Sequence, residues 1–414
     1  MSKKEKLSTE SYKGVRDFYP EDQAFMNYLI ATCREAVQRF GYVEYHASIL
    51  ESSELYRSKG AENEEMVNEQ TYTFTDRGGR EVTLRPEMTP TVARMVAGRR
   101  RELGFPLRYF SIPNVFRYER PQRGRLREHW QLNVDLFGSK SLASDAELIM
   151  VAHDLMFAFG AKSEDFIIKI GSRTYLDELA RTYGLSPEST RALLALLDRR
   201  NKMPQEEFET KLEELGVPLS ALSTDAEPED VASVIKTLNE VGIGNACFDP
   251  SIVRGFNYYN GIVFELFDTH PENNRALFGG GRYDNLTALF DDEPISGVGF
   301  GMGDVTIRDF LEVRHLLPPY IPATKLYLAV MDPLLVPYAL GLASELRKGG
   351  VNTAVDFGDK KVSDQIKAAT KHQIPFLIVI GENEVAASEF KLRTLGTGEE
   401  TLLKRDELVK YFTN

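Results

Sequence analysis

The 414-residue sequence predicts an α+β protein: a mainly antiparallel sheet flanked by helices, a helical insertion, and a C-terminal α/β domain with a mostly parallel sheet. Three observations support this. Residues 72–84 hold two β-rich runs separated by Asp-Arg-Gly-Gly, which is typical of a hairpin. Residues 172–244 have leucines at helical spacing. Beyond a proline-rich segment, strand-like and helical segments alternate, as they do around a parallel sheet.

The first element is a helix over residues 21–40, where apolar residues from Phe25 to Cys33 follow the turn-like pair Tyr19-Pro20. After the hairpin, residues 107–115 and 257–267 are β-rich and bordered by glycine or proline, so we expect them in one sheet. A returning strand is expected over residues 130–137, and alternation places Gln131, Asn133 and Asp135 on one of its faces.

The helical insertion contains a clear helix start, because Ser186 is a good N-cap and Pro187 fits the first helical position. In the tail, strands at 325–331, 351–357 and 375–381 alternate with helices at 335–347 and 361–371. Residues 390–403 turn at Gly396-Thr397-Gly398 and should add a hairpin. We therefore expect a core domain over residues 1–320 and an α/β domain over residues 325–414.

Composition limits the possible functions. Two cysteines without metal-ligand spacing favour a reducing compartment, and the polar N-terminus and the lack of a long apolar run indicate a cytoplasmic protein. A net charge of −12 argues against a general RNA-binding protein, which would carry basic residues over the whole chain. The six histidines show no close ligand spacing, so no metal-ligating residue is predicted.

Positive charge is concentrated in one place. Ten arginines, no lysine and two acids lie between Arg94 and Arg127. Arginine binds phosphate through two parallel hydrogen bonds, so this run predicts a phosphate site; a solvated basic surface is the alternative. Strand alternation would place Arg117 and Glu119 on one face, followed by a basic loop at Arg123-Gly124-Arg125.

These motifs resemble one known family. GVRDFYPED, TLRPEMTPTVARM, FRYERPQRGRLREHWQLNVDLFG, RGFNYYNGIVFE and FGGGRYDNL occur in the order seen in histidyl-tRNA synthetases, a class II aminoacyl-tRNA synthetase family. The resemblance covers nearly the whole chain, including an anticodon-binding-like tail. It implies a class II synthetase-like sheet and a ligase that activates L-histidine with ATP and Mg2+ and transfers it to tRNA(His).

The resemblance also implies roles for individual residues. Arg117 is expected to hold the α-phosphate of ATP, Glu119 to seat the adenine, Arg125 to reach the phosphates and His129 to stack on the adenine. Arg254 matches an arginine that contacts both the α-phosphate and the histidine carboxylate, so Arg117 and Arg254 are the catalytic candidates. The expected histidine-binding residues are Glu87, Gln131, Asp135, Arg254, Tyr258, Tyr259 and Tyr283. The alternative interpretations are a surface acid at a strand end for Glu87 and simple packing within a sheet for Tyr258 and Tyr259.

The sequence departs from the family pattern in three places. The third motif lacks its usual arginine, because GFGMGDVTIRDFL places Thr306 there; Arg308 follows two residues later, about 200° away around a helix. His129 stands where a phenylalanine is more common. Ser48 replaces a proline of the first motif, which usually forms the dimer interface, and Asn257 replaces an aspartate. A homodimer remains the expectation.

The missing third-motif arginine leaves an alternative function. A non-catalytic synthetase-like subunit that regulates ATP phosphoribosyltransferase would also bind histidine. Such regulators generally lack the C-terminal α/β domain, so the tail favours the ligase.

Overall fold

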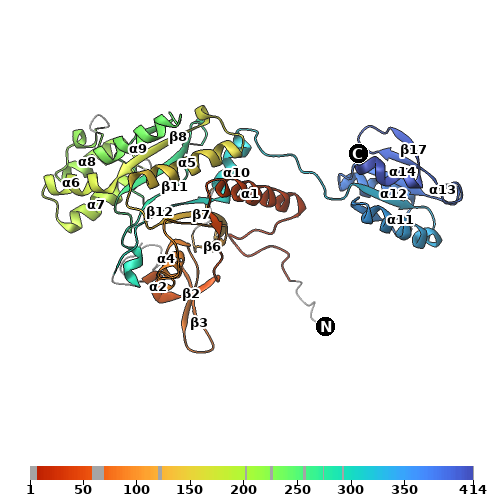
Figure 1. Cartoon of the computed structure of the whole chain (residues 1–414), viewed down its shortest axis with the longest axis horizontal. Helices are drawn as coiled ribbons and strands as arrows, with labels where there is room; N and C mark the ends of the chain where they lie inside the picture. Colours follow the sequence, from red (N-terminus) through yellow and green to blue (C-terminus); the bar gives the residue numbers. More distant parts are fainter. Residues whose placement is uncertain are drawn as a thin grey trace. The chain divides into compact units, whose positions relative to one another are not determined.

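The computed structural model describes residues 7–57, 70–119, 124–200, 203–223, 227–254, 258–273, 275–290 and 293–413. The chain divides into two compact units, Met1–Pro318 and Pro319–Asn414, which are coloured red to cyan and blue in Figure 1. Each has its own hydrophobic core. No helix in the described ranges is long and apolar enough to cross a membrane.

The first unit is built on a nine-stranded sheet, counted over the described residues. Its inner strands are antiparallel, and among the described residues parallel pairs occur only at the two edges, β1 with β5 and β8 with β9. This confirms the predicted antiparallel sheet. The strands, in sheet order, are β1 Val43–Glu44, β5 Leu107–Ser111, β7 Glu128–Phe137, β12 Gly297–Gly303, β11 Ala276–Arg282, β10 Ile262–Asp268, β8 Phe166–Ser172 and β9 Ala246–Phe248, with β6 Asn114–Phe116 beside β7.

Helices cover one face of this sheet (Figure 1). Leu132, Val134 and Leu136 of β7 point into the core beneath them. The alternate residues of β7 therefore lie on the opposite face, where α4 (Thr89–Gly98) packs. The covering helices are α1 Pro20–Gln38, α5 Leu142–Ala158, α9 Glu229–Glu240 and α10 Asp304–Val313.

The predicted hairpin is confirmed. It belongs to a three-stranded sheet of β2 (Leu50–Ser52), β4 (Glu81–Leu84) and β3 (Tyr72–Thr75), and it projects from the unit next to the short helix α2 (Ser53–Arg57) (Figure 1). In its turn, Asp76 Oδ1 accepts hydrogen bonds from the amides of Gly78 and Arg80.

The helical insertion is also confirmed and has a separate core of leucines, Phe208 and Val217. The Ser186 hydroxyl accepts a hydrogen bond from the Ser189 amide, and Pro187 is the first helical residue, as predicted. The elements of the insertion before α9 are α6 Arg173–Thr182, α7 Pro187–Asp198, α8 Gln205–Glu214 and the 3-10 turn η3 Leu219–Leu222. Another 3-10 turn, η1 Ser163–Asp165, precedes β8.

Two strand predictions need correction. Strand β6 ends at Phe116, so Arg117 and Glu119 lie in the following irregular segment and not on a strand face. Strand β10 begins at Ile262, so Tyr258 and Tyr259 precede it, while Asn257 is outside the described residues. In both places the main chain leaves the sheet to form a site.

The second unit confirms the predicted α/β order, with sheet order β14-β13-β15-β16-β17. Its first three strands are parallel, and the predicted hairpin β16–β17 adds two antiparallel strands. The elements are β13 Leu326–Val330, η5 Pro333–Leu335, α11 Val336–Lys348, β14 Thr353–Val355, α12 Val362–Lys371, β15 Phe376–Ile380, α13 Glu382–Ala387, β16 Glu389–Thr394, β17 Glu400–Lys404 and α14 Arg405–Thr413.

Candidate active site

A small cavity lies on the α4 side of the large sheet, over β7, β12 and β11. Its volume is about 30 Å³, room for about two water molecules. The lining residues are Glu87, Thr89, Arg117, Gln131, Asn133, Arg254, Tyr258, Tyr259, Gly279, Tyr283, Gly299, Phe300 and Gly301.

Glycines on neighbouring strands create this space. Gly301 pairs with Asn133 on one side and Gly279 on the other. A methyl group on Gly299 would lie 2.4 Å from Asp135 Oδ1, and one on Gly301 would lie 2.9 Å from Gln131 Nε2. Because no side chain rises from these positions, the polar side chains of β7 border an open space.

The first polar pair of the pocket is Glu87 with Tyr258. The Tyr258 hydroxyl donates to Glu87 Oε2 at 3.0 Å, while Glu87 Oε1 is buried without a partner among the described residues. Burial raises the pKa of Glu87 to about 7, although the charge of Arg117 and the tyrosine hydrogen bond oppose this. This carboxyl therefore titrates near neutrality and can accept a cationic group.

The second pair is Asp135 with Tyr283. The Tyr283 hydroxyl donates to Asp135 Oδ1, and Asp135 Oδ2 has no partner in the described part of the chain. Burial raises the pKa of Asp135 to about 7, against the effect of the tyrosine hydrogen bond. Glu87 and Tyr258 thus line the cavity as one carboxyl–phenol pair, and Asp135 is joined to the cavity through Tyr283, which lines it.

Arg254 supplies positive charge to the same cavity. Its main chain has φ +55°, a left-handed conformation that is uncommon outside glycine. Nη1 donates to Glu265 Oε1 at 2.6 Å and Nη2 to the Gly279 carbonyl at 3.3 Å, whereas Nε is buried with no partner among the described residues. Burial disfavours the charge, but Glu265 outweighs it and raises the pKa of Arg254. The guanidinium stays cationic.

Of the four expected ATP-binding residues, one lines this cavity. Arg117 lines it and donates from Nε to the Pro86 carbonyl at 2.9 Å. Glu119 and Arg125 form an ion pair at 3.2 Å. Burial, together with the charges of Arg117 and Arg16, lowers the pKa of His129 to about 3. His129 is therefore a neutral ring, which suits stacking on a base.

The third-motif segment has an arrangement of its own. Asp304 is buried, and its carboxylate accepts from Arg16 Nη2 at 2.7 Å and from the Trp130 amide at 2.9 Å. Arg308 donates to Asp22 on α1 and to Glu312, each at 2.9 Å. These bonds hold Arg308 against α1, so it does not take the place of the arginine missing at Thr306.

The structure brings together most of the predicted histidine-binding residues, and it adds others. Thr89 and Asn133 line the cavity. Burial, followed by the charge of Asp135, raises the pKa of Tyr45 against the opposing effect of the Ser111 side chain. Ser111 itself pairs in register with Asn133. Asn133 shares the strand face of Gln131, which was its only sequence signal; no pattern marked Tyr45 or Ser111.

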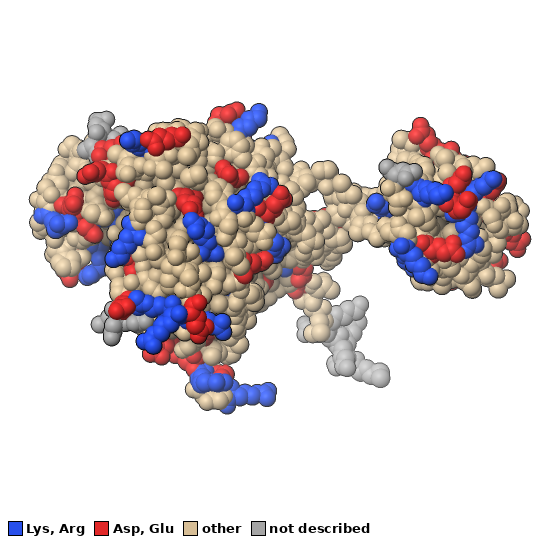
Figure 2. Space-filling model, viewed as in Figure 1, with Lys and Arg blue, Asp and Glu red and all other residues tan. Residues whose placement is uncertain are grey.

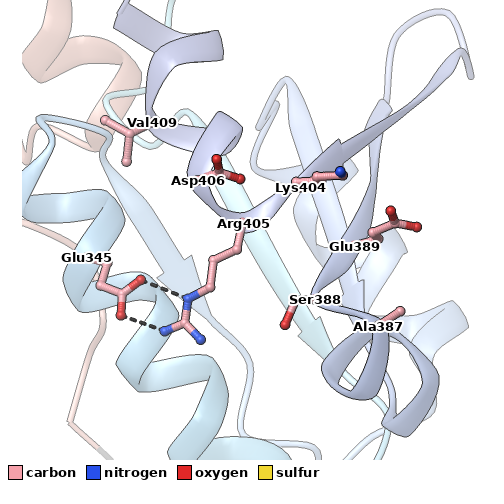
Figure 3. A pocket seen from close by; sticks show the side chains of 8 residues that line it. All are labelled: Glu345, Ala387, Ser388, Glu389, Lys404, Arg405, Asp406 and Val409. Carbon is pink, nitrogen blue, oxygen red and sulfur yellow. Dashed lines mark hydrogen bonds and ion pairs between the residues drawn. The ribbon is translucent and has the colours of Figure 1, made fainter.

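The second unit carries a shallow hollow of about 660 Å³ (Figure 3). Arg405 crosses it and pairs with Glu345 through Nε–Oε2 at 2.9 Å and Nη2–Oε1 at 2.5 Å. Lys404, Glu389 and Asp406 add both signs of charge. Positive and negative side chains are likewise interspersed over the visible faces of both units (Figure 2).

Within the described ranges, no group of three or more His, Cys, Asp or Glu side chains is arranged to hold a metal ion.

Known proteins match both units. Residues 14–305 match the family described as histidyl-tRNA synthetase, and residues 325–414 match the family described as anticodon binding domain. The histidine–tRNA ligase of Leptospira biflexa is 42% identical over 417 residues, covering 95% of each chain. That of Thermoplasma volcanium is 33% identical and covers 98% of each.

A solved structure agrees with the fold. The apo histidyl-tRNA synthetase of S. aureus has a TM-score of 0.77 at 25% identity, covering 98% of this chain and 100% of that one. The family match over most of the first unit and the full-length relatives lead to one conclusion: this chain belongs to the histidyl-tRNA synthetase family.

Proposed function

We propose that this chain is a histidine–tRNA ligase, which joins L-histidine to ATP as histidyl-adenylate with release of pyrophosphate, and then transfers histidine to the 3′ end of tRNA(His). One observation carries the proposal beside the family relationship. Glu87, Tyr258, Tyr283 and Arg254 line one cavity, and the buried Asp135 accepts a hydrogen bond from Tyr283. Histidine has a cationic amine, a ring with two nitrogens and a carboxylate, which this set complements.

Each group of the amino acid has a proposed partner. The ammonium would bind Glu87, whose Oε1 has no partner in the described part of the chain. The imidazole would have Asp135 and Tyr283 on one side. The side chains of Gln131, Tyr258 and Tyr259 would lie on the other. The carboxylate would face Arg254. Buried hydrogen-bonding groups of this kind discriminate strongly against substrates that cannot pair with them.

ATP would bind on the Arg117 side of the cavity. There Arg117 contacts the α-phosphate, Glu119 and His129 hold the adenine, and Arg125 reaches the remaining phosphates. Magnesium would arrive with the triphosphate and neutralise part of its charge. We propose residues 1–320, which include the whole first unit, as the catalytic core.

The chemistry needs no protein nucleophile. A histidine carboxylate oxygen forms a bond to the α-phosphorus as the bond to the pyrophosphate oxygen breaks, and pyrophosphate leaves with the electron pair. Two anions must approach each other in this step, and Arg117 and Arg254 would offset their repulsion. A terminal ribose hydroxyl of the tRNA then attacks the carbonyl carbon, and AMP leaves.

The remaining parts of the proposal concern assembly. Residues 325–414, which match an anticodon-binding family, would contact tRNA(His). A homodimer in the cytoplasm is proposed from the family relationship. Exposed apolar residues on the short strands, Val43, Leu50 and Phe74, are 61%, 42% and 48% exposed and suit contact with a second copy.

The test is histidine-dependent exchange of pyrophosphate into ATP by purified protein with magnesium. The proposal expects exchange that requires L-histidine. A regulatory subunit of ATP phosphoribosyltransferase is the second candidate, favoured only by Thr306 at the third-motif position. Histidine binding without any exchange would support that regulator instead, although the anticodon-binding match weighs against it.

A further inference from the structure

The proposed nucleotide site has Thr306 at the third-motif position, so an arginine there does not neutralise the far end of the triphosphate. Two arginines near that motif are held elsewhere. Arg308 is paired with Asp22 and Glu312, and Arg16 is paired with the buried Asp304.

Arg275 lies in the right place. It is exposed and immediately precedes β11. A methyl group on Gly124 would lie 3.5 Å from Arg275 Nη1 and 4.0 Å from Thr306 Cγ2. The guanidinium and the Thr306 side chain therefore flank the same point of the chain, next to Arg125, which is the proposed phosphate ligand of this loop.

The main chain that follows Arg275 is also held in place. The Thr306 hydroxyl donates to the Leu277 carbonyl at 2.7 Å, which ties the start of β11 to the first turn of α10. Leu277 is buried in the main core. The base of the Arg275 side chain is therefore anchored beside the first turn of α10.

We propose that Arg275 binds the β- and γ-phosphates of ATP and so supplies the charge that an arginine at position 306 would supply. This inference rests on the proposed function. As the bond from the α-phosphorus to the leaving oxygen breaks, negative charge grows on pyrophosphate. A guanidinium at this end, making two charge-assisted hydrogen bonds, would stabilise that charge.

The first experiment measures binding and kinetics of Arg275→Ala. Loss of a charge-assisted contact should weaken ATP binding and raise the KM for ATP by about 10- to 100-fold. AMP has no β- or γ-phosphate, so its binding should stay within about twofold, as should the KM for histidine. Arg275→Lys should recover part of the loss, and Arg308→Ala is the control with unchanged KM for ATP.

The double variant Arg275→Ala/Thr306→Arg tests position. If the two residues serve one phosphate group, the new arginine should restore ATP affinity at least partly. Equal loss of AMP and ATP binding, or an unchanged KM for ATP in Arg275→Ala, would overturn the inference while wild-type exchange activity still supported the ligase. Absence of exchange in the wild type would instead count against the proposed function, and the ATP-to-AMP affinity ratio would still decide the role of Arg275.

Discussion

Replacing Glu87 with glutamine should stabilise the catalytic unit above neutral pH and weaken histidine binding. Glutamine keeps the shape of the side chain and can still accept the hydrogen bond from Tyr258, but it cannot ionise. The wild-type carboxyl is fully buried, with a pKa raised to about 7 from an ordinary value of 4.5.

The size and sign follow from these two values. As the pH rises above 4.5, the unfolded chain loses this proton first, so the folded state loses stability until the pH passes about 7. At about 1.4 kcal/mol per pH unit, the loss approaches about 3 kcal/mol. Glu87→Gln should therefore match the wild type near pH 4 and exceed it in unfolding free energy by up to about 3 kcal/mol at pH 8.

The chain offers a convenient probe. Trp130 is its single tryptophan; it lies on β7, with its ring centroid 5.1 Å from that of Phe18. Its fluorescence during urea unfolding reports on the catalytic unit alone. Glu178→Gln, on the exposed side of α6, is the control and should leave the pH dependence unchanged.

Histidine affinity gives the second measurement. The variant should bind L-histidine about 10- to 100-fold more weakly, because the ammonium group of histidine loses its charged partner. A wild-type unfolding free energy that did not fall relative to Glu87→Gln between pH 4 and 8 would refute the buried, shifted carboxyl. Unchanged histidine affinity would refute its role as the ammonium partner.

Three other outcomes are expected. Arg254→Ala should cut the adenylation rate about 100-fold or more but change histidine binding far less, as measured by pre-steady-state kinetics and calorimetry; a rate that barely moves would contradict its role at the α-phosphate. Gly299→Ala, whose methyl meets Asp135 at 2.4 Å, should cost about 1–3 kcal/mol of stability and raise the KM for histidine more than that for ATP; equal effects on both would count against a histidine pocket. Deleting the residues after Pro322 should reduce tRNA charging about tenfold or more while leaving pyrophosphate exchange largely intact; equal loss of both would argue against a separate RNA-binding domain.

Local patterns predicted the elements whose cause is local. The Ser186 cap, the Asp76 turn and the α/β tail each depend on neighbouring residues, and each is present as predicted. The strand face of Gln131, Asn133 and Asp135 followed from alternation, and the register confirms it.

Features that depend on contacts between residues far apart in the chain could not be predicted from the sequence. The segment after β6 leaves the sheet, so alternation did not apply to Arg117 and Glu119. The three glycines at 279–281 lie within β11, where atoms of neighbouring strands leave no room for a side chain, and no local pattern distinguishes them from the glycines of a turn. The pairing of Arg16 with Asp304 joins residues 288 apart in sequence, and no local pattern indicates it.

The spare polar atoms of Glu87, Asp135 and Arg254 have a consequence for amino-acid choice. Glu87 Oε1, Asp135 Oδ2 and Arg254 Nε each lack a hydrogen-bond partner among the described residues, and a buried polar atom is costly to leave unpaired. Bound histidine would form hydrogen bonds with all three atoms. An amino acid of similar size with an apolar ring would bury at least one of them without a hydrogen bond. Rejection would then come from that penalty, which is large enough in such sites to make a second, proofreading site unnecessary.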